Sequence, residues 1–306
     1  MLCEIHQFGN FWFTWLFITL ITTVVTALLS TPVFIYYYAY PTYEKWTRKS
    51  NPTYPTADKV RDEIIQTLKG VASAALCPAI SLWLQQTGWS QGYCGVEPHG
   101  WMWLLVSFFI VWLGSDFYEF YYHRLGHMTN VGWLQHKYHH VFFNPTPFSV
   151  IADEYIDQFV RAMPLVLFPL ILPINVDMMY VTFGVFFYGY GVALHCGHEL
   201  DMISAHNYWI NTPFQHYVHH AKSVYKKPYH TGFFIKVWDR MFGSLYEEKC
   251  VCAECARKEG KRGVEKWNKV KKIDYSPLLS WRFWKNPENF EQVQQMEADV
   301  AGDKKE

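Results

Sequence analysis

Long apolar segments alternate with shorter polar and charged segments along this chain. The first runs from residue 11 to residue 43 without a charged side chain, which exceeds the ~20 residues that a helix needs to cross a bilayer. A weaker apolar segment covers residues 70–84, and a strong one covers residues 101–120. Two further runs, at residues 164–173 and 176–194, are joined by a tight turn. They predict a hairpin that enters the membrane and returns, and the first run is short enough to be re-entrant instead. The pattern therefore predicts an all-α integral membrane helix bundle with about four to five transmembrane spans.

Basic residues favour one orientation of this bundle. Lys45, Arg48 and Lys49 follow the first apolar segment, whereas the loop at residues 85–100 contains no Lys or Arg. The positive-inside tendency then places the basic side in the cytosol and the N-terminus in the lumen. A cleavable signal peptide is not expected, because no basic residue precedes the first apolar segment and that segment is too long.

Composition changes this interpretation little. The chain has 27 basic and 27 acidic residues and a net charge of zero, and the basic residues are spread out, so nucleic acid is not an expected partner. The seven cysteines lack the spacing of a disulfide framework, and reduced thiols are expected. Cys250, Cys252 and Cys255 could hold a metal. A structural zinc site normally needs four ligands, however, and the sequence offers no obvious fourth, so ordinary loop thiols are the alternative.

Histidines carry the chemical signal. The chain has 14 of them, and eight form three compact patterns: H-R-L-G-H (His123, His127), H-K-Y-H-H (His136, His139, His140) and H-Y-V-H-H (His216, His219, His220). Positions three and four apart share one face of a helix, so each pattern is expected to aim its imidazoles in one direction. Eight imidazoles exceed the four-coordinate sphere of one zinc ion and imply two metals. Imidazole suits iron, zinc and copper alike, so ligand type does not select the element.

Two carboxylates precede the first pattern. Asp116 and Glu119 lie seven and four residues before His123, on the same helical stripe. Each could accept the second ring N–H of a metal-bound histidine and fix its tautomer. The alternative is a carboxylate at the helix end that faces water or pairs with Arg124.

With these residues in place, the chain resembles the fatty acid hydroxylase superfamily. This group of membrane di-iron enzymes includes sterol desaturases, sterol C4-methyl oxidases and lipid hydroxylases. The resemblance runs from residue 116 to residue 246 and includes Trp238-Asp-Arg-Met-Phe-Gly after the third pattern. It divides the chain into an N-terminal transmembrane region (1–115), a di-iron catalytic domain with the hairpin (116–246) and a cytosolic C-terminal segment with a tail (247–306).

Within the superfamily, Pro145-Thr-Pro-Phe-Ser is most similar to the sterol C5-desaturase branch. Ile151 and Glu154 stand where that branch has further histidines, and His230 stands where asparagine is usual. The resemblance also implies histidine ligands between the second and third patterns. The natural candidates are His195 and His198, with His206 as the rival of His198. The implied ligand set is His123, His127, His136, His139, His140, His195, His198, His216, His219 and His220.

The resemblance implies a membrane-bound, O2-dependent oxidoreductase. Two iron ions, which zinc can replace in purified relatives, would use O2 and electrons from NAD(P)H, delivered by cytochrome b5 or a similar carrier. The substrate would be a sterol or related lipid, desaturated as by a C5-desaturase or hydroxylated at a C–H bond. Alternatives are a sterol C4-methyl oxidase, a fatty-acyl or other lipid hydroxylase, a hydrolytic zinc enzyme, and a catalytically silent metal- or lipid-binding relative. The endoplasmic reticulum is the location expected for a eukaryotic source, with the catalytic face and C-terminus in the cytosol.

Overall fold

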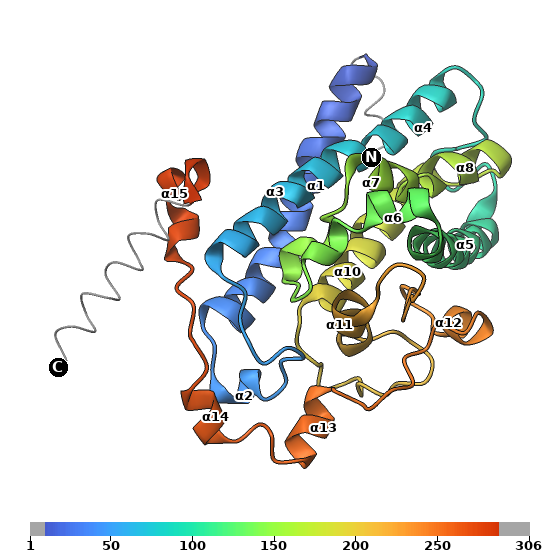
Figure 1. Cartoon of the computed structure of the whole chain (residues 1–306). Helices are drawn as coiled ribbons and strands as arrows, with labels where there is room; N and C mark the ends of the chain where they lie inside the picture. The colour runs from blue at the N-terminus through green and yellow to red at the C-terminus, as the bar shows by residue number, and fades with distance from the viewer. Residues whose placement is uncertain (1–9, 288–306) are drawn as a thin grey trace.

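The computed structural model describes residues 10–287 of the chain (Figure 1). Within this range the chain folds into helices joined by loops, and it forms isolated bridges but no β-strand. The prediction of an all-α helix bundle is confirmed.

Three helical segments are long and apolar enough to cross a membrane. They are α1 (Phe11–Phe34) with the π-helical turn η2 (Ile35–Ala39), the consecutive helices α3 (Ala57–Ala74) and α4 (Leu76–Gln86), and α5 (Gly100–Met128). The side chain of Asn10 caps α1 by accepting a hydrogen bond from the backbone N–H of Phe13 (3.0 Å). Large apolar side chains along α1, including Trp12, Leu20 and Leu28, face outward, as expected where a helix borders lipid.

The predicted hairpin has one short arm and one long arm. Its first arm, α8 (Pro164–Ile171), has eight residues, and a helix of that length spans only about 12 Å. Pro169 lies inside α8, and Pro173 follows its end, where a helix cannot continue easily. The second arm is continuous from α9 (Val176–Val181) through the π-helical turn η5 (Thr182–Phe187) to α10 (Tyr188–His195). Three helices of the described chain are thus long and apolar enough to span a membrane, where the sequence predicts about four to five.

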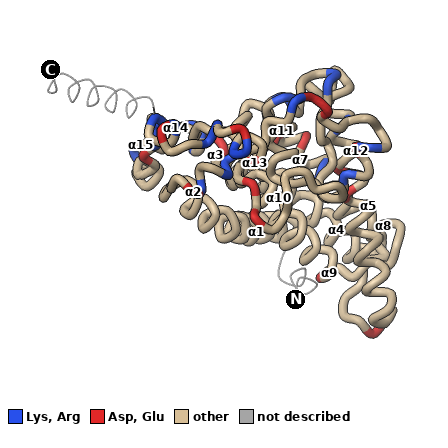
Figure 2. Tube along the Cα trace, turned by 90° about the horizontal axis from the view of Figure 1, so that it is seen from below, with Lys and Arg blue, Asp and Glu red and all other residues tan. Residues whose placement is uncertain are grey.

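The long helices support a cap of shorter ones. α1 packs against α3, α4 and α10, and α3 packs against α7 (Tyr155–Arg161) and the turn η4 (Pro147–Ile151). Lys, Arg, Asp and Glu gather around the cap, whereas α1, α4 and α8 contain none of them (Figure 2). The cap elements are α2 (Tyr43–Trp46), α6 (Asn130–His136), η3 (His139–Val141), α11 (Pro213–Lys222), α12 (Val237–Met241), α13 (Ala253–Lys258) and α14 (Val264–Asn268).

The C-terminal segment packs on the bundle as far as it is described. After α14 the chain forms η6 (Ser276–Leu279) and α15 (Trp281–Lys285). The ring of Tyr275 contacts that of Phe34 (centroids 5.0 Å apart), and its hydroxyl donates to the carbonyl oxygen of Pro55 (2.7 Å). The predicted terminal tail lies outside the described residues. The predicted domain boundary at residues 115/116 falls within α5.

One cysteine departs from the expectation of reduced thiols. Cys94, in the loop between α4 and α5, is disulfide-bonded. The other five cysteines of the described chain are free.

Candidate metal centre

Nine of the ten predicted histidine ligands converge in two adjacent groups, most of them buried. Within each group, one ring nitrogen from every histidine lies within 4.8 Å of the others. The first histidine group is His123, His127, His136, His140 and His219. The second histidine group is His139, His195, His216 and His220.

The second sequence pattern divides between these groups. α6 ends at His136, and the chain continues into the 3-10 turn η3, which starts at His139. Because the helix does not continue, the three imidazoles do not share a face. His136 and His140 belong to the first group, whereas His139 belongs to the second. The expectation that each pattern aims its imidazoles in one direction is wrong here.

The third pattern also divides, although it lies on one helix. α11 begins with a capping box formed by Thr212 and Gln215. His216 and His220 are one turn apart and join the second group, while His219 turns toward the first group. α11 therefore contributes to both groups. His195, the last residue of α10, completes the second group from the opposite side.

Within each group the Nε2 atoms lie close together. The Nε2 atoms of His123 and His136 are 3.0 Å apart, and Nε2 of His140 lies 3.1 Å from those of both His127 and His136. Imidazole nitrogens that bind one ion at about 2.0–2.1 Å and at right angles are separated by about 2.9 Å. The spacing fits nitrogens that share a metal ion.

The hydrogen bonds of the Nδ1 atoms indicate that a cation would stabilise the close contacts between Nε2 atoms. Nδ1 faces a backbone carbonyl oxygen in His123 (Thr231, 3.0 Å), His195 (Gly191, 2.7 Å) and His219 (Tyr229, 2.7 Å). A carbonyl oxygen only accepts, so Nδ1 carries the proton and Nε2 presents a lone pair. Nε2 of His219 has no hydrogen-bond partner. A metal ion would satisfy lone pairs that otherwise face one another in a buried site.

Burial keeps these ligands neutral. It lowers the pKa of His139 to about 4 and holds the pKa of His136 and His219 well below the usual value. Metal binding requires neutral imidazole, so the residues are in the correct protonation state at neutral pH.

Two carboxylates that the sequence analysis missed contact the histidines. Asp157 Oδ2 lies 3.0 Å from Nδ1 of His136, and Asp153 Oδ1 lies 3.1 Å from Nδ1 of His139. Both carboxylates are buried. Asp153 and Asp157 thus make the contacts with histidine Nδ1 that were expected of Asp116 and Glu119. The sequence gives no local signal for these contacts, because Asp153 and Asp157 follow His140 by 13 and 17 residues.

Glu119 has a different partner from the ones expected. Its carboxylate pairs with the Arg161 guanidinium and not with a histidine or Arg124. Arg161 Nε also lies 3.6 Å from Asp157 and 3.9 Å from Asp153. Glu119 thus balances the arginine that lies between the two histidine-bound carboxylates.

Asp116 holds backbone instead of a histidine. Its carboxylate accepts from the backbone N–H groups of Phe234 (2.7 Å) and Ile235 (3.2 Å) and from Nε1–H of Trp238 (2.8 Å). Thr231, in the same segment, receives the hydrogen bond of His123. Asp116 therefore acts on the histidine groups through the position of this segment.

His198 and His206 lie apart from both groups. His198 is buried against Tyr37, with ring centroids 4.2 Å apart, and its Nδ1 lies 2.9 Å from the carbonyl oxygen of Cys196. His206 lies among three cysteines. The structure brings neither residue to the histidine groups as a tenth member.

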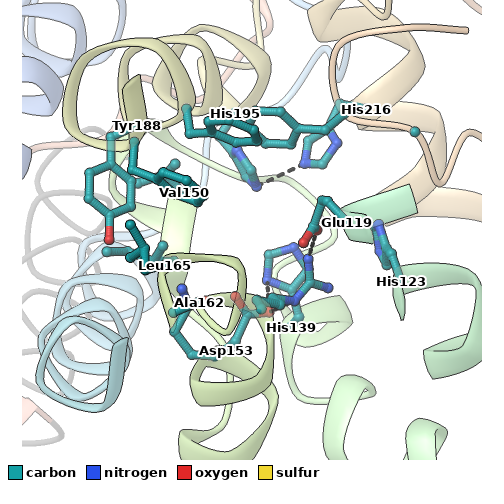
Figure 3. A pocket seen from close by; sticks show the side chains of 17 residues that line it. Glu119, His123, His139, Val150, Asp153, Ala162, Leu165, Tyr188, His195 and His216 are labelled. Atoms are coloured by element: carbon teal, nitrogen blue, oxygen red, sulfur yellow. Dashed lines mark hydrogen bonds and ion pairs between the residues drawn. The ribbon is translucent and has the colours of Figure 1, made fainter. Parts of the chain in front are cut away.

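A cavity of about 90 Å³ opens beside the histidine groups (Figure 3). Histidines and Asp153 form one side, and Val150, Leu165 and Tyr188 form the other. A second, more apolar cavity of about 260 Å³ lies between α1, α4 and η5. Leu165, Phe183 and Tyr188 line both cavities. An apolar molecule could therefore reach the histidines from the membrane-facing part of the bundle.

These features define a membrane helix bundle with a polyhistidine site. Known proteins are similar to this chain in sequence. Residues 108–244 match the model of the fatty acid hydroxylase family. The chain is 30% identical over 135 residues to a Δ(7)-sterol 5(6)-desaturase of Gibberella zeae (44% of this chain, 41% of that protein). It is 28% identical over 191 residues to lathosterol oxidase of Mus musculus (61% and 62%). It is 27% identical over 150 residues to alkylglycerol monooxygenase of Xenopus tropicalis (49% and 31%).

These matches show that residues 108–244 are similar to the fatty acid hydroxylase family. The chain spans less than two thirds of the length of each of these three relatives. No solved structure is significantly similar to it. The family match and the histidine groups together indicate iron binding.

Proposed function

We propose that this protein is a membrane-bound, O2-dependent di-iron oxidoreductase that acts on a sterol or related lipid. The observation that carries the proposal is the convergence of nine imidazoles in two groups beside an apolar cavity. The names of the relatives favour desaturation of a sterol, as in the C5-desaturase branch. Hydroxylation of a C–H bond in another lipid is the second candidate, favoured by the similarity to an alkylglycerol monooxygenase.

The first histidine group would hold one iron ion and the second group the other. Bound iron would supply the activation of O2 that removal of hydrogen from an unactivated C–H bond requires. An all-nitrogen donor set is compatible with iron, zinc or copper, and the family match favours iron. Electrons are proposed to come from NAD(P)H through cytochrome b5 or a similar carrier.

The surrounding residues orient the ligands and exclude water. Backbone carbonyls and the carboxylates of Asp153 and Asp157 hold the Nδ1 side of the rings, so the Nε2 lone pairs point inward. Val150, Leu165 and Phe187 form apolar walls of the smaller cavity. Such walls place a C–H bond next to the metals while excluding bulk water.

The two carboxylates next to the site do not favour the hydrolytic alternative. A hydrolytic zinc enzyme needs a general base that reaches its metal-bound water. Asp153 and Asp157 instead contact the outer nitrogens of His139 and His136 and lie near Arg161. Their contacts are those of groups that orient metal ligands.

We infer that the histidine groups face the cytosol. The disulfide-bonded Cys94 precedes α5, whereas His123 and His127 lie near the end of its 29 residues, a helix length of about 43 Å. Disulfides form in oxidising compartments such as the lumen of the endoplasmic reticulum. Met241 is exposed in the cap helix α12. Labelling of Met241→Cys above the level of the unsubstituted protein, by an impermeant thiol reagent outside sealed, cytosolic-face-out vesicles, would support this orientation. Labelling no greater than that of the unsubstituted protein would oppose it.

Oxygen-dependent turnover tests the proposed function directly. Membranes that contain the protein and NADH are supplied with a Δ7-sterol or an alkylglycerol, in air and under argon. We expect product only in air, with loss of two hydrogens for desaturation or gain of one oxygen for hydroxylation. Lipid profiles of cells with and without the protein identify other substrates. If no lipid changed in an oxygen-dependent manner in either experiment, the proposal would be wrong.

Filling the larger cavity should impair turnover without disturbing the metals. Gly184 lines this cavity, and a Cβ placed there has no atom within 4 Å apart from those of its chain neighbours and of its own helix backbone. Gly184→Leu should therefore fold, occupy the lipid path and lower kcat/KM about tenfold or more. Gly189 has similar free space but lines neither cavity, so Gly189→Leu is the matched control. Equal activity of the two variants would argue against this path.

A further inference from the structure

A second cluster of metal-binding side chains lies outside the histidine groups. His206, Cys250, Cys252 and Cys255 each bring one ligand atom within 4.8 Å of the others. Nε2 of His206 lies 3.4 Å from Sγ of both Cys252 and Cys255 and 3.7 Å from Sγ of Cys250. All three thiols are free. We propose that these four side chains form a structural zinc site.

The distances between the ligand atoms fit a tetrahedral zinc ion. Zinc binds sulfur at about 2.3 Å and imidazole nitrogen at about 2.0–2.1 Å, which places sulfur and nitrogen about 3.5 Å apart at the tetrahedral angle. The three sulfur–nitrogen distances here bracket this value. Thiolates combined with imidazole favour zinc over the oxygen-seeking ions magnesium and calcium. Four protein ligands leave no open position, which is typical of a structural site.

The local backbone supports thiolates at these positions. Cys252 is the N-cap residue of α13, and its Sγ accepts a hydrogen bond from the backbone N–H of Cys255 (3.2 Å). Sγ of Cys250 accepts from the backbone N–H of Cys252 (3.4 Å). Hydrogen bonds from N–H groups stabilise an ionised acceptor and orient metal ligands. These hydrogen bonds hold the thiol groups of the turn in place.

Other contacts bring His206 to this turn. The Glu199 carboxylate accepts from the backbone N–H groups of Ala253 and Glu254 at the start of α13. Nε2–H of Gln215 donates to the carbonyl oxygen of Ala205 (2.5 Å). Cys252 also packs in a buried cluster with Ala205, Phe214 and Val218. The loop before α11 and the cysteine turn are therefore held together by contacts that do not involve a metal.

The position of the cluster indicates what a zinc ion would do there. His206 and Cys250 are 44 residues apart in sequence, and His206 lies in the loop that joins His195 to His216. A zinc ion would fasten the C-terminal segment to this loop, which leads into α11, the helix that contributes to both histidine groups. The site would stabilise the scaffold of the metal centre without contacting substrate. This inference does not depend on the proposed oxidoreductase activity.

Zinc K-edge absorption of the full-length protein, purified in detergent without chelators, separates this site from the histidine groups. Zinc bound in the cysteine cluster has sulfur neighbours at about 2.3 Å, whereas zinc that has entered a histidine group has only nitrogen or oxygen neighbours. We expect sulfur scattering and about one equivalent of sulfur-bound zinc per chain. Zinc with nitrogen and oxygen neighbours only, or no bound zinc, would overturn the proposal. This measurement needs no variant.

A pair of histidine variants tests the assignment of the fourth ligand. His206 is exposed, and so is His99 in the loop before α5. His206→Ala removes one of the four ligands. It should therefore remove most of the sulfur-bound zinc and lower the thermal unfolding temperature, while iron stays bound. His99→Ala should retain both metals. Equal retention of sulfur-bound zinc by the two variants would exclude His206 as a ligand.

Discussion

Replacing His219 by alanine should abolish oxygen-dependent lipid turnover. His219 Nε2 has no hydrogen-bond partner and points into the first histidine group, with ring centroids 4.3 Å from His123 and 4.7 Å from His140. Removing a residue that hydrogen-bonds to a metal ligand costs about 10–100-fold in metal affinity or activity. Loss of the ligand itself should cost more than about a hundredfold. Turnover and bound iron are measured together in the same membrane preparation.

The second histidine group should show the same dependence. His139 contacts His220, with ring centroids 4.4 Å apart, and His139→Ala removes one of its four members. We expect each alanine variant to lose iron, since each group is proposed to hold one ion. Loss of turnover with full retention of two irons would show that the histidines act in another way. Unchanged turnover in either variant would contradict the proposed catalytic site.

His198→Phe is the matched control for these variants. His198 is as deeply buried as His219, but its ring stacks on Tyr37, and phenylalanine can keep that contact. We therefore expect this variant to retain two irons and most of the turnover. Iron loss comparable to that of His219→Ala would restore His198 as a ligand.

The histidine patterns predicted which residues meet, but not how they divide. Sequence spacing on a regular helix places His136, His139 and His140 on one face. The chain leaves the helical path after His136, so His139 joins the other group. His219 separates from His216 and His220 because its direction differs from theirs by about 60° and about 100°, whereas His216 and His220 differ by only about 40°. Local spacing thus identifies ligands, whereas the ends of helices decide which ion each ligand can reach.

The hydrogen-bond partners of Asp116 and Asp157 lie far from them in sequence and could not be predicted. Asp116 lies on the same helix as His123, yet it binds the backbone of Phe234 and Ile235. Asp157 is 21 residues from His136, on another helix. The sequence contains no local signal for these pairings, because they depend on how α5, α6 and α7 pack together.

The apolar segments also predicted the helices only in part. The apolar segments at residues 11–43, 70–84 and 101–120 each lie in a long helix, α1, α3–α4 and α5, although the second helix begins at Ala57, well before its apolar segment. The segment at 164–173 is apolar but holds Pro164, Pro169 and Pro173, which limit the helix to α8. Hydropathy indicates which residues avoid water, and proline decides how far a helix extends. The result is a short α8 whose Leu165 lines both cavities.

Substitution of Asp157 should test directly whether a buried carboxylate orients a histidine ligand. Asp157 Oδ2 lies 3.0 Å from Nδ1 of His136, and both side chains are buried. Asp157→Asn keeps the shape but removes the charge, and its amide NH2 can face Nδ1 and favour the wrong tautomer. We expect iron affinity and kcat to fall about 10–100-fold while the variant remains folded.

A surface aspartate provides the comparison for this variant. Asp62 is partly exposed and pairs with Arg61, and an exposed pair of this kind contributes only about 0–1 kcal/mol. Asp62→Asn should therefore leave iron content and kcat unchanged. If Asp157→Asn behaved in the same way, the carboxylate would only fill space. If it lost iron affinity and regained turnover at high iron concentration, the carboxylate would act through the position and charge of His136. This second result is expected, because the Asp157 carboxylate contacts Nδ1 of His136, while Nε2 of His136 lies 3.0 Å and 3.1 Å from those of His123 and His140.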